Sequence, residues 1–378
     1  MSPAQGPLGT GALTIGVDAR ELQGRPTGTG RYLRNLLRLW TAGADDRFVA
    51  YFNGPPPADP VLAHPRILCR GLPSRRGLFW QERSLPEAAR TDGIQVFFSP
   101  AYTCPLALHV PRVTAVHDLS FFSHPQDFGA LDGLRRRVLV AASIRASRTV
   151  LACSEFTRRE IAGRFPDCAD RILHVPLGPD DDLPPPPPRA EARARRGARG
   201  PYLLTVGAVL NRRCLPELLH AVALLRRPWP RLRLDVIGEN RTHPRLDLEG
   251  LVQMLDLGGH VRLAGFADEA TLAECYAAAD AAVFLSEYEG FGLPALEAAA
   301  RGVPLLVSRR PALGEIFGEA ALVVEPRDVT AVAGALDRLL SEQALRESLV
   351  SRGRALAARY SWAETARQTL GAMHGATP

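Results

Sequence analysis

Two glutamates, Glu289 and Glu297, lie on either side of a Gly-Phe-Gly-Leu-Pro segment in the stretch SEYEGFGLPALEAAA. Gly290 and Gly292 allow the backbone to turn sharply and to approach a ligand closely. Pro294 suits a first helical position, because its missing N–H would have no intrahelical partner there. The free N–H groups and the dipole of the new helix favour an anion. Two carboxylates beside such a site would repel a phosphate unless each binds something else, such as hydroxyls. The stretch therefore predicts a ligand that contains both phosphate and sugar.

Two adjacent arginines provide a second candidate site. Arg212 and Arg213 follow the strand-like run LLTVGA, which ends near Gly207, and they directly precede a helical pattern. Two guanidinium groups in this position could clamp a diphosphate through bidentate hydrogen bonds. A solvated arginine pair is the alternative interpretation in such an arginine-rich chain. The position at the carboxyl end of a predicted strand favours a functional role.

Two further strand ends carry candidate residues. The run RVTAVHD ends in His117 and Asp118. This histidine could exchange a proton or offer its carbonyl to a sugar hydroxyl, or Asp118 could simply satisfy it within a turn. After the first predicted strand, Gly28 and Gly30 lead into a helix and predict a lip facing phosphate or sugar; an ordinary connecting loop is equally compatible. The dinucleotide-binding fingerprint is absent, because Leu33 stands where its third glycine is required.

Strand-like runs alternate with helical patterns along most of the chain, which favours parallel sheets covered by helices. The runs in the first half are ALTIGVDA, RFVAYF, RILCRGL, IQVFFSPA, RVTAVHDL, RTVLACS and RILHVPLG. Those in the second half are PYLLTVGA, RLRLDVIGE, HVRLAGF, AAVFLS, VPLLVS and ALVVEP. A helical tail is expected from about residue 328 to residue 373. The predicted fold class is α/β.

A proline-rich segment divides the two halves. Five consecutive prolines at 184–188 and the arginine-rich residues after them are typical of a stiff linker or solvated loop. With 378 residues, the chain is also too long for one ordinary core. We therefore predict an N-terminal Rossmann-like domain (1–178), a linker (179–200), a C-terminal Rossmann-like domain (201–360) and a final helix (361–378) that returns to the first domain.

The composition excludes several kinds of chemistry. All 46 basic residues are arginine, so a Schiff-base lysine, a pyridoxal phosphate anchor and a Walker A lysine are impossible. The six cysteines are scattered singly, which is typical of core residues in a reducing compartment. The acidic run at 180–182 lies beside the prolines and not after a strand, so we expect no metal site. With no signal peptide or membrane-spanning run, we expect a cytoplasmic enzyme without a nucleic-acid partner.

Taken together, these residues resemble the retaining glycosyltransferases of family 4, which have the GT-B fold of two Rossmann-like domains facing each other across a cleft. The segment EYEGFGLPALEA is similar to the E-x7-E signature of that family, and VGAVLNRRCL and ADAAVFLSEYEG support the match. The segments VTAVHDLSFFSHPQDF and GENRTHPRLDLEGL are similar to bacterial mannosyltransferases within the family. The resemblance covers nearly the whole chain.

The resemblance implies a nucleotide-sugar donor held mainly by the C-terminal domain. Glu297 would bind the ribose hydroxyls and Glu289, as a catalytic residue, the transferred sugar. Arg212 and Arg213 would bind the diphosphate, with Arg213 replacing the lysine of the family's Arg-Lys pair. His117 and Asp118 would lie near the reaction centre. The other donor-binding residues implied are Gly28, Gly30, Gly207, Phe266, Gly290, Phe291, Gly292 and Leu293.

In such an enzyme the acceptor hydroxyl attacks the face that the leaving diphosphate occupied, and no cofactor or metal is expected. GDP-mannose is the predicted donor and a UDP-sugar the alternative; the acceptor would be a glycan or a lipid-linked saccharide. A nucleotide-sugar epimerase or hydrolase, or a non-catalytic sugar-nucleotide binding protein, would share the donor half of the site. The basic run 135–137 could contact anionic lipid headgroups at the inner face of the membrane, or form a solvated helix face.

Overall fold

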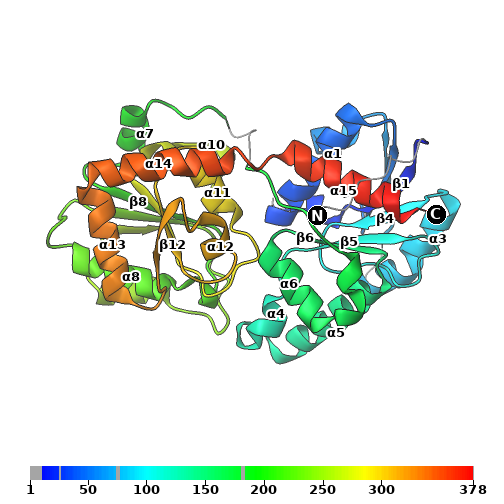
Figure 1. The fold of residues 1–378 in the computed structure, drawn as a ribbon, viewed down its shortest axis with the longest axis horizontal. Coiled ribbons are helices and arrows are strands. Elements are labelled where there is room, and N and C mark those ends of the chain that lie inside the picture. The colour runs from blue at the N-terminus through cyan, green and yellow to red at the C-terminus, as the bar shows by residue number, and fades with distance from the viewer. Residues whose placement is uncertain (1–10, 25–26, 74–76, 180–183, 378) are drawn as a thin grey trace. The chain divides into compact units, whose positions relative to one another are not determined.

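The computed structural model describes residues 11–24, 27–73, 77–179 and 184–377. The chain forms two compact units, each built on a parallel sheet (Figure 1). The first unit contains the chain up to Leu119, then Leu134–Leu177, and then everything from Ser361 on. The second contains Ser120–Gly133 and Gly178–Tyr360. The acidic run at 180–182 lies outside the described residues.

The first unit has a seven-stranded sheet in the order β3-β2-β1-β4-β5-β6-β7. Its strands are β1 (Thr14–Asp18), β2 (Arg47–Phe52), β3 (Ile67–Gly71), β4 (Val96–Ser99), β5 (Arg112–Val116), β6 (Thr149–Ala152) and β7 (Ile172–His174). The helices are α1 (Gly28–Gly43), α2 (Gly77–Phe79), α3 (Leu85–Thr91), most of α5 (Ala130–Ala146), α6 (Glu155–Arg164) and α15 (Trp362–Ala376).

The second unit has a six-stranded sheet in the order β10-β9-β8-β11-β12-β13. Its strands are β8 (Tyr202–Val206), β9 (Arg233–Ile237), β10 (Val261–Leu263), β11 (Ala281–Phe284), β12 (Leu305–Ser308) and β13 (Ala321–Val324). The helices are α4 (Ser120–Ser123), α7 (Arg189–Arg196), α8 (Leu215–Leu225), α9 (Leu248–Met254), α10 (Glu269–Ala278), α11 (Leu293–Ala300), α12 (Leu313–Phe317), α13 (Val329–Ser341) and α14 (Gln343–Ala357).

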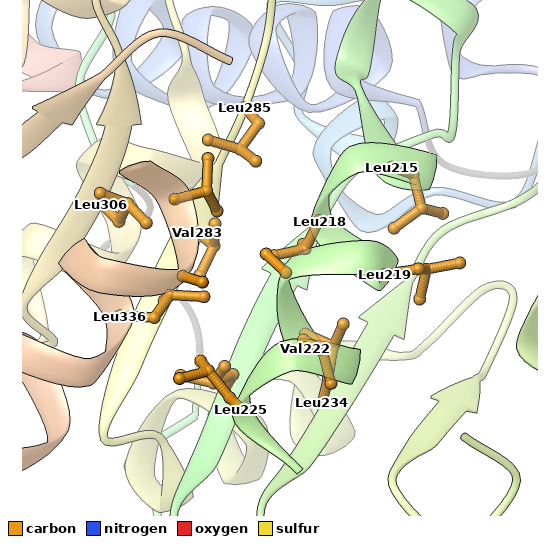
Figure 2. Close-up of a cluster of buried hydrophobic side chains, with 14 of the residues drawn as sticks. Leu215, Leu218, Leu219, Val222, Leu225, Leu234, Val283, Leu285, Leu306 and Leu336 are labelled. Atoms are coloured by element: carbon orange, nitrogen blue, oxygen red, sulfur yellow. The ribbon is translucent and has the colours of Figure 1, made fainter. Parts of the chain in front are cut away.

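Each of the thirteen predicted strand runs contains one of these strands, so the predicted α/β class is confirmed. Central strands such as β11 and β12 are buried along their whole length, as expected for parallel strands covered on both faces. In the second unit, leucine and valine side chains from α8, α13 and the sheet form one continuous core (Figure 2). This core fixes the strand ends that carry the candidate site.

The interpretation of the whole segment 179–200 as a linker is wrong for its arginine-rich part. Residues 189–196 form helix α7, which packs against α10. The helix buries Ala192, and Arg193 reaches Asp280 with an Nη1–Oδ2 distance of 2.8 Å. Gly197 ends the helix in the left-handed conformation. The many arginines of this segment made it resemble a solvated loop, although the inner face of the helix pairs with carboxylates on or next to the sheet.

The helical tail is three helices, α13, α14 and α15, not one long element. Within the first unit, α15 packs along α1, where Trp40 Nε1 donates a hydrogen bond to the carbonyl of Ala366 at 2.9 Å. His374 Nε2 also lies 3.1 Å from Asp46 Oδ2. The last helix therefore completes the first unit, although it is the last element in the sequence.

Candidate functional site

The second unit has a pocket at the carboxyl ends of β8 and β11, where the chain order of the strands reverses. Ligands of open α/β sheets bind at such switch points. The cavity measures about 30 Å³, room for about one water, so a larger ligand would lie over its rim. The lining residues are Thr205, Val206, Gly207, Ala208, Val209, Arg213, Leu215, Leu218, Val236, Phe284, Leu285, Ser286, Glu289, Gly292, Pro294 and Leu313.

The Gly-Phe-Gly-Leu-Pro turn leads into α11 at this pocket. Gly292 caps the helix with a φ of 96°, and a side chain on it would overlap Leu313. Pro294 occupies the second helical position, one residue later than predicted, because the helix begins at Leu293. Proline is still tolerated there, since the first four N–H groups of a helix have no intrahelical partner. The positive end of the α11 dipole therefore lies at the pocket, and anion binding there stays a prediction.

Arg213 and Glu289 meet in the pocket. Arg213 Nε donates to Glu289 Oε1 at 2.7 Å, and Arg213 Nη1 donates to the carbonyl of Ala208 at 2.9 Å. The Ser286 hydroxyl donates to the same Glu289 oxygen at 3.0 Å. Gly207, with a φ of 117°, leaves the space that the guanidinium fills. The arginine and the carboxylate are therefore oriented before any ligand arrives.

Arg212 lies in a short 3-10 turn just before α8, with its side chain 10% exposed. Its Nη1 is 3.7 Å from Asp127 Oδ2, and its carbonyl accepts a hydrogen bond from the Glu287 N–H at 2.8 Å. Within the described part of the chain, Arg212 Nε has no hydrogen-bond partner. A buried donor without a partner is costly, so a phosphate oxygen that reaches Arg212 would relieve this cost.

Glu297 lies one turn into α11 and is 1% exposed. Its Oε2 accepts a hydrogen bond from the Tyr276 hydroxyl at 3.0 Å, and the same hydroxyl is 3.3 Å from the carbonyl of Pro294. Tyr276 on α10 therefore holds the second glutamate of the signature in place. Glu289 lines the small pocket, whereas neither Glu297 nor Tyr276 does.

The remaining predicted donor residues of the second unit surround this turn. Gly290 and Phe291 are buried, and the Phe291 ring contacts Tyr360 with centroids 5.7 Å apart. Leu293 is half-buried as the first residue of α11. Phe266 is 52% exposed and follows β10, two strands beyond β8 on the same edge of the sheet. Adjacent strands lie about 4.8 Å apart, so Phe266 follows a strand about 10 Å from β8, and its role in donor binding stays a prediction.

His117 and Asp118 lie in the first unit, at the carboxyl end of β5. His117 Nε2 donates to the carbonyl of Pro100 at 2.8 Å, which leaves Nδ1 as the acceptor in the neutral ring. Burial lowers the pKa of His117, against the opposing effects of the Pro100 hydrogen bond and Asp118. The Cys153 thiol donates to the carbonyl of His117 at 3.1 Å. The histidine is therefore a neutral group at pH 7 with a fixed orientation.

The loop after β4 orients both of these residues. Tyr102 has a φ of 59°, and its hydroxyl donates to Asp118 Oδ2 at 2.9 Å. Its ring packs edge-on against the ring of His117, with centroids 5.7 Å apart. The Pro100 carbonyl thus orients His117, and the Tyr102 hydroxyl orients Asp118. The sequence offered no signal for them, because they belong to a different strand end from the residues they hold.

Gly28 and Gly30 lie at the start of α1, also in the first unit. Thr27 caps the helix by accepting a hydrogen bond from the Gly30 N–H at 2.9 Å. Gly28 is exposed, whereas Gly30 packs against the carbonyl of Glu21. One turn further on, Tyr32 contacts the His117 ring with centroids 5.1 Å apart. The glycines and His117 are therefore on the same edge of the first sheet.

The described residues contain no group of three or more His, Cys, Asp and Glu side chains that could hold a metal ion. Independence of metal stays a prediction. Other polar side chains at the site, Tyr276 and Ser286, were missed by sequence reasoning. Ser286 is three residues before Glu289, and a serine at a strand end was a usable signal. Tyr276 is 21 residues before Glu297 and gave none.

Family models match both halves of the chain. Residues 26–183 match the model described as Glycosyltransferase Family 4, and residues 189–356 match Glycosyl transferases group 1. The second match begins at α7, in agreement with the place of that helix in the second unit.

Curated relatives support this match. The chain is 33% identical to the O-antigen chain mannosyltransferase B of Escherichia coli over 285 residues, 73% of each protein. It is 32% identical over 225 residues to the MMP alpha-(1->4)-mannosyltransferase of Mycolicibacterium hassiacum, 58% of this chain and 52% of that protein. It is also 34% identical over 248 residues to the D-inositol 3-phosphate glycosyltransferase of Kineococcus radiotolerans, 60% and 57% of the two.

Solved structures share the fold. The sucrose-phosphate synthase of Thermosynechococcus elongatus has a TM-score of 0.77 at 24% identity, over 94% of this chain and 97% of that one. Anabaena HepE in complex with UDP-glucose has a TM-score of 0.75 at 16% identity, over 94% and 98%. The two parallel-sheet units, the Arg213–Glu289 pair at the start of α11 and these relatives agree: the chain belongs to glycosyltransferase family 4 and is a glycosyltransferase with the GT-B fold.

Proposed function

We propose that this chain is a retaining hexosyltransferase that moves mannose from GDP-mannose onto a glycan or lipid-linked saccharide. The observation that carries the proposal is the contact between Arg213 and Glu289 beside the start of α11. It puts a cation and a carboxylate side by side at the positive end of the α11 dipole, and we assign the cation to phosphate and the carboxylate to hydroxyls. A ligand with a sugar joined to a diphosphate satisfies all three.

Each residue then has a role. Glu289 accepts hydrogen bonds from the hydroxyls of the transferred sugar, and Glu297 binds the ribose. Arg212, Arg213 and the N–H groups of Phe291, Gly292 and Leu293 receive the diphosphate. Phe266 is assigned to the donor as well, and its exposed ring after β10 offers a surface for the base. His117 and Asp118, together with Gly28 and Gly30, are assigned to the sugar side of the reaction.

The reaction breaks the bond between the anomeric carbon and the diphosphate oxygen and forms a bond from that carbon to the acceptor oxygen. Positive charge builds on the sugar ring and negative charge on the leaving diphosphate. Oriented cations and dipoles that stabilise the leaving group are worth the most in catalysis, and Arg212, Arg213 and α11 supply them. The acceptor proton passes to the departing phosphate oxygen, so the acceptor adds to the face that the diphosphate leaves.

Mannose is supported by the names of two relatives, an O-antigen chain mannosyltransferase and an MMP mannosyltransferase. A UDP-sugar is the second candidate, because Anabaena HepE, which shares the fold, was solved with UDP-glucose. A nucleotide-sugar epimerase, a hydrolase or a non-catalytic binding protein would need the donor half of the site alone.

Release of GDP from GDP-mannose, measured with and without acceptor saccharides, separates these functions. The proposal expects acceptor to raise turnover well above hydrolysis, and NMR of the product to show the same anomeric configuration as the donor. His117→Ala should lower transfer while donor binding remains. Turnover that no acceptor raises would favour the hydrolase or epimerase, and an inverted product would refute the retaining mechanism. Binding without any turnover would leave the non-catalytic function.

A lipid-linked acceptor would bring this enzyme to a membrane surface. No helix among the described residues is long and apolar enough to cross a bilayer. On α5, however, Leu134 is 53% and Val138 58% exposed, four residues apart on one face. Arg135 and Arg137 lie on the two sides of this apolar stripe, an arrangement that suits the interface of an anionic bilayer. We infer peripheral contact at the inner face of the membrane through α5.

Sedimentation with vesicles tests this contact. Binding to vesicles of phosphatidylglycerol and phosphatidylcholine should fall at least about tenfold in Leu134→Glu/Val138→Glu. Each change removes apolar area that the bilayer would bury and adds a negative charge that the anionic lipid repels. Leu68→Glu changes a leucine on β3 that is 47% exposed and serves as the control. Equal loss in the control, or no binding by the unchanged protein, would refute the contact.

A further inference from the structure

A second cavity lies in the second unit at the amino ends of β11 and β12, the opposite edge of the sheet from the site above. Helix α11 begins at the first pocket and ends beside this cavity, which is named here the α14 groove. The groove measures about 520 Å³, within the range of about 300–1,000 Å³ that small-molecule sites occupy. It is lined by Arg189, Ala279, Asp280, Gly302, Pro304, Arg346, Glu347, Val350, Ser351 and Arg354.

Two arginines on one face of α14, eight residues apart, give the groove its charge. Arg346 Nη1 donates to the carbonyls of Leu339 and Leu340 at 2.9 and 2.8 Å, which fixes the guanidinium. The guanidinium of Arg354 packs on the backbone of Gly302, where a side chain would overlap it. Among the residues that the structure describes, neither arginine has a carboxylate within ion-pair distance.

The acidic residues of the groove do not cancel this charge. Asp280 is paired with Arg189 at 2.6 Å and with Arg193 at 2.8 Å. Glu347 accepts a hydrogen bond from the neutral Gln343 at 2.8 Å. The groove lining thus holds three arginines and two carboxylates, a local excess of one positive charge, and Arg193 adds a further arginine at Asp280. Such an excess beside the half-buried Arg346 and the exposed Arg354 favours an anion, and phosphate matches the geometry of guanidinium groups.

The other walls of the α14 groove suit a sugar. Val350 and Pro304 offer apolar surface, while Ser351 and Glu347 offer an exposed hydroxyl and a carboxylate. We propose that the α14 groove is a second ligand site that binds a phosphorylated saccharide of one or two sugar units. Arg346 and Arg354 bind the phosphate, and the serine and carboxylate bind the hydroxyls. The proposal does not rest on the donor site, because the two pockets share no residue.

Thermal shift with glucose 6-phosphate tests the site. At about 10 mM ligand and a dissociation constant near 1 mM, the melting temperature should rise by about 2–5 °C. The rise should disappear in Arg346→Gln/Arg354→Gln and remain in Arg213→Met, which disables the first site. Arg352→Gln changes an exposed arginine of the same helix outside the groove and should keep the full rise.

Any of the following results would overturn the proposal. The first is no rise in the unchanged protein, and the second is a rise that survives the double substitution. The third is an equal rise with neutral maltose, which would remove the role of the phosphate, or with inorganic phosphate alone, which would remove the role of the saccharide. If the double variant melts early without ligand, the single variants Arg346→Gln and Arg354→Gln replace it, and each should weaken the rise.

Discussion

Replacing Arg213 with methionine is expected to lower kcat/KM for the nucleotide sugar by about 100- to 1,000-fold, the loss typical of removing one preorganised charge that stabilises a leaving group. Glu289 at 2.7 Å and the carbonyl of Ala208 at 2.9 Å fix the guanidinium of Arg213. A neighbouring cation could take over this position only if the site rearranged. Steady-state release of the nucleoside diphosphate measures the effect. Methionine keeps the length of the side chain and removes its charge.

Arg213→Lys separates charge from shape. Lysine keeps the charge but lacks the planar guanidinium, so it cannot contact Glu289 and the carbonyl of Ala208 at the same time in the way that arginine does. Because the family resemblance implies a lysine at this position, we expect Arg213→Lys to stay within about tenfold of the unchanged enzyme. Arg227→Met, a change at an exposed arginine after α8, should have no effect. An Arg213→Met enzyme within tenfold of the unchanged one would show that Arg213 does not serve the leaving group.

The second large effect is on stability, at Asp235 in β9. This carboxylate is fully buried and accepts a hydrogen bond from the Tyr202 hydroxyl at 2.6 Å. It also pairs with three arginines: Arg196 at 3.1 Å, Arg233 at 3.2 Å, and Arg262. Asp235→Asn would leave these cations without their anion. Removing one partner of a buried ion pair costs about 3–5 kcal/mol in the free energy of unfolding.

Denaturation in urea, followed by circular dichroism, measures this loss. Asp256→Asn removes the partner of Arg226 at a site where the carboxylate is 91% exposed, so it should cost about 0–1 kcal/mol. If Asp235→Asn costs no more than this control, the network does not stabilise the second unit. Arg196 belongs to α7, so the same variant should also loosen that helix from the sheet.

The strands, and the candidate residues at their carboxyl ends, could be located in the sequence, because apolar runs bounded by glycine, proline and charge are read directly from it. The glutamate signature was predictable for the same reason: Gly292, Pro294 and Glu297 are local to one turn. Helix α7 was missed, because its buried face consists of Ala192 and the aliphatic parts of arginines. A charged residue inside the apolar run RLRLDVIGE was a sign of the Asp235 network that sequence reasoning left unused.

Contacts between distant segments were beyond prediction. Arg213 and Glu289 are 76 residues apart, and the family resemblance assigned them to different parts of the ligand. Their contact depends on the pairing of β8 with β11, which brings two strand ends together. Tyr102 beside Asp118 and Tyr276 beside Glu297 depend in the same way on elements that are adjacent in space but not in sequence.

The central claim is that the second unit binds a nucleotide sugar through the turn at α11. A thermal-shift panel with GDP-mannose, UDP-glucose, UDP-N-acetylglucosamine, GDP and UDP tests it most directly, since a ligand that binds the folded state alone raises the melting temperature with its affinity. The panel is repeated with Glu297→Ala and with the exposed control Glu249→Ala. We expect the GDP series to stabilise the unchanged protein and the control, and Glu297→Ala to lose the effect. Stabilisation by no nucleotide, or equal stabilisation of Glu297→Ala, would contradict the claim.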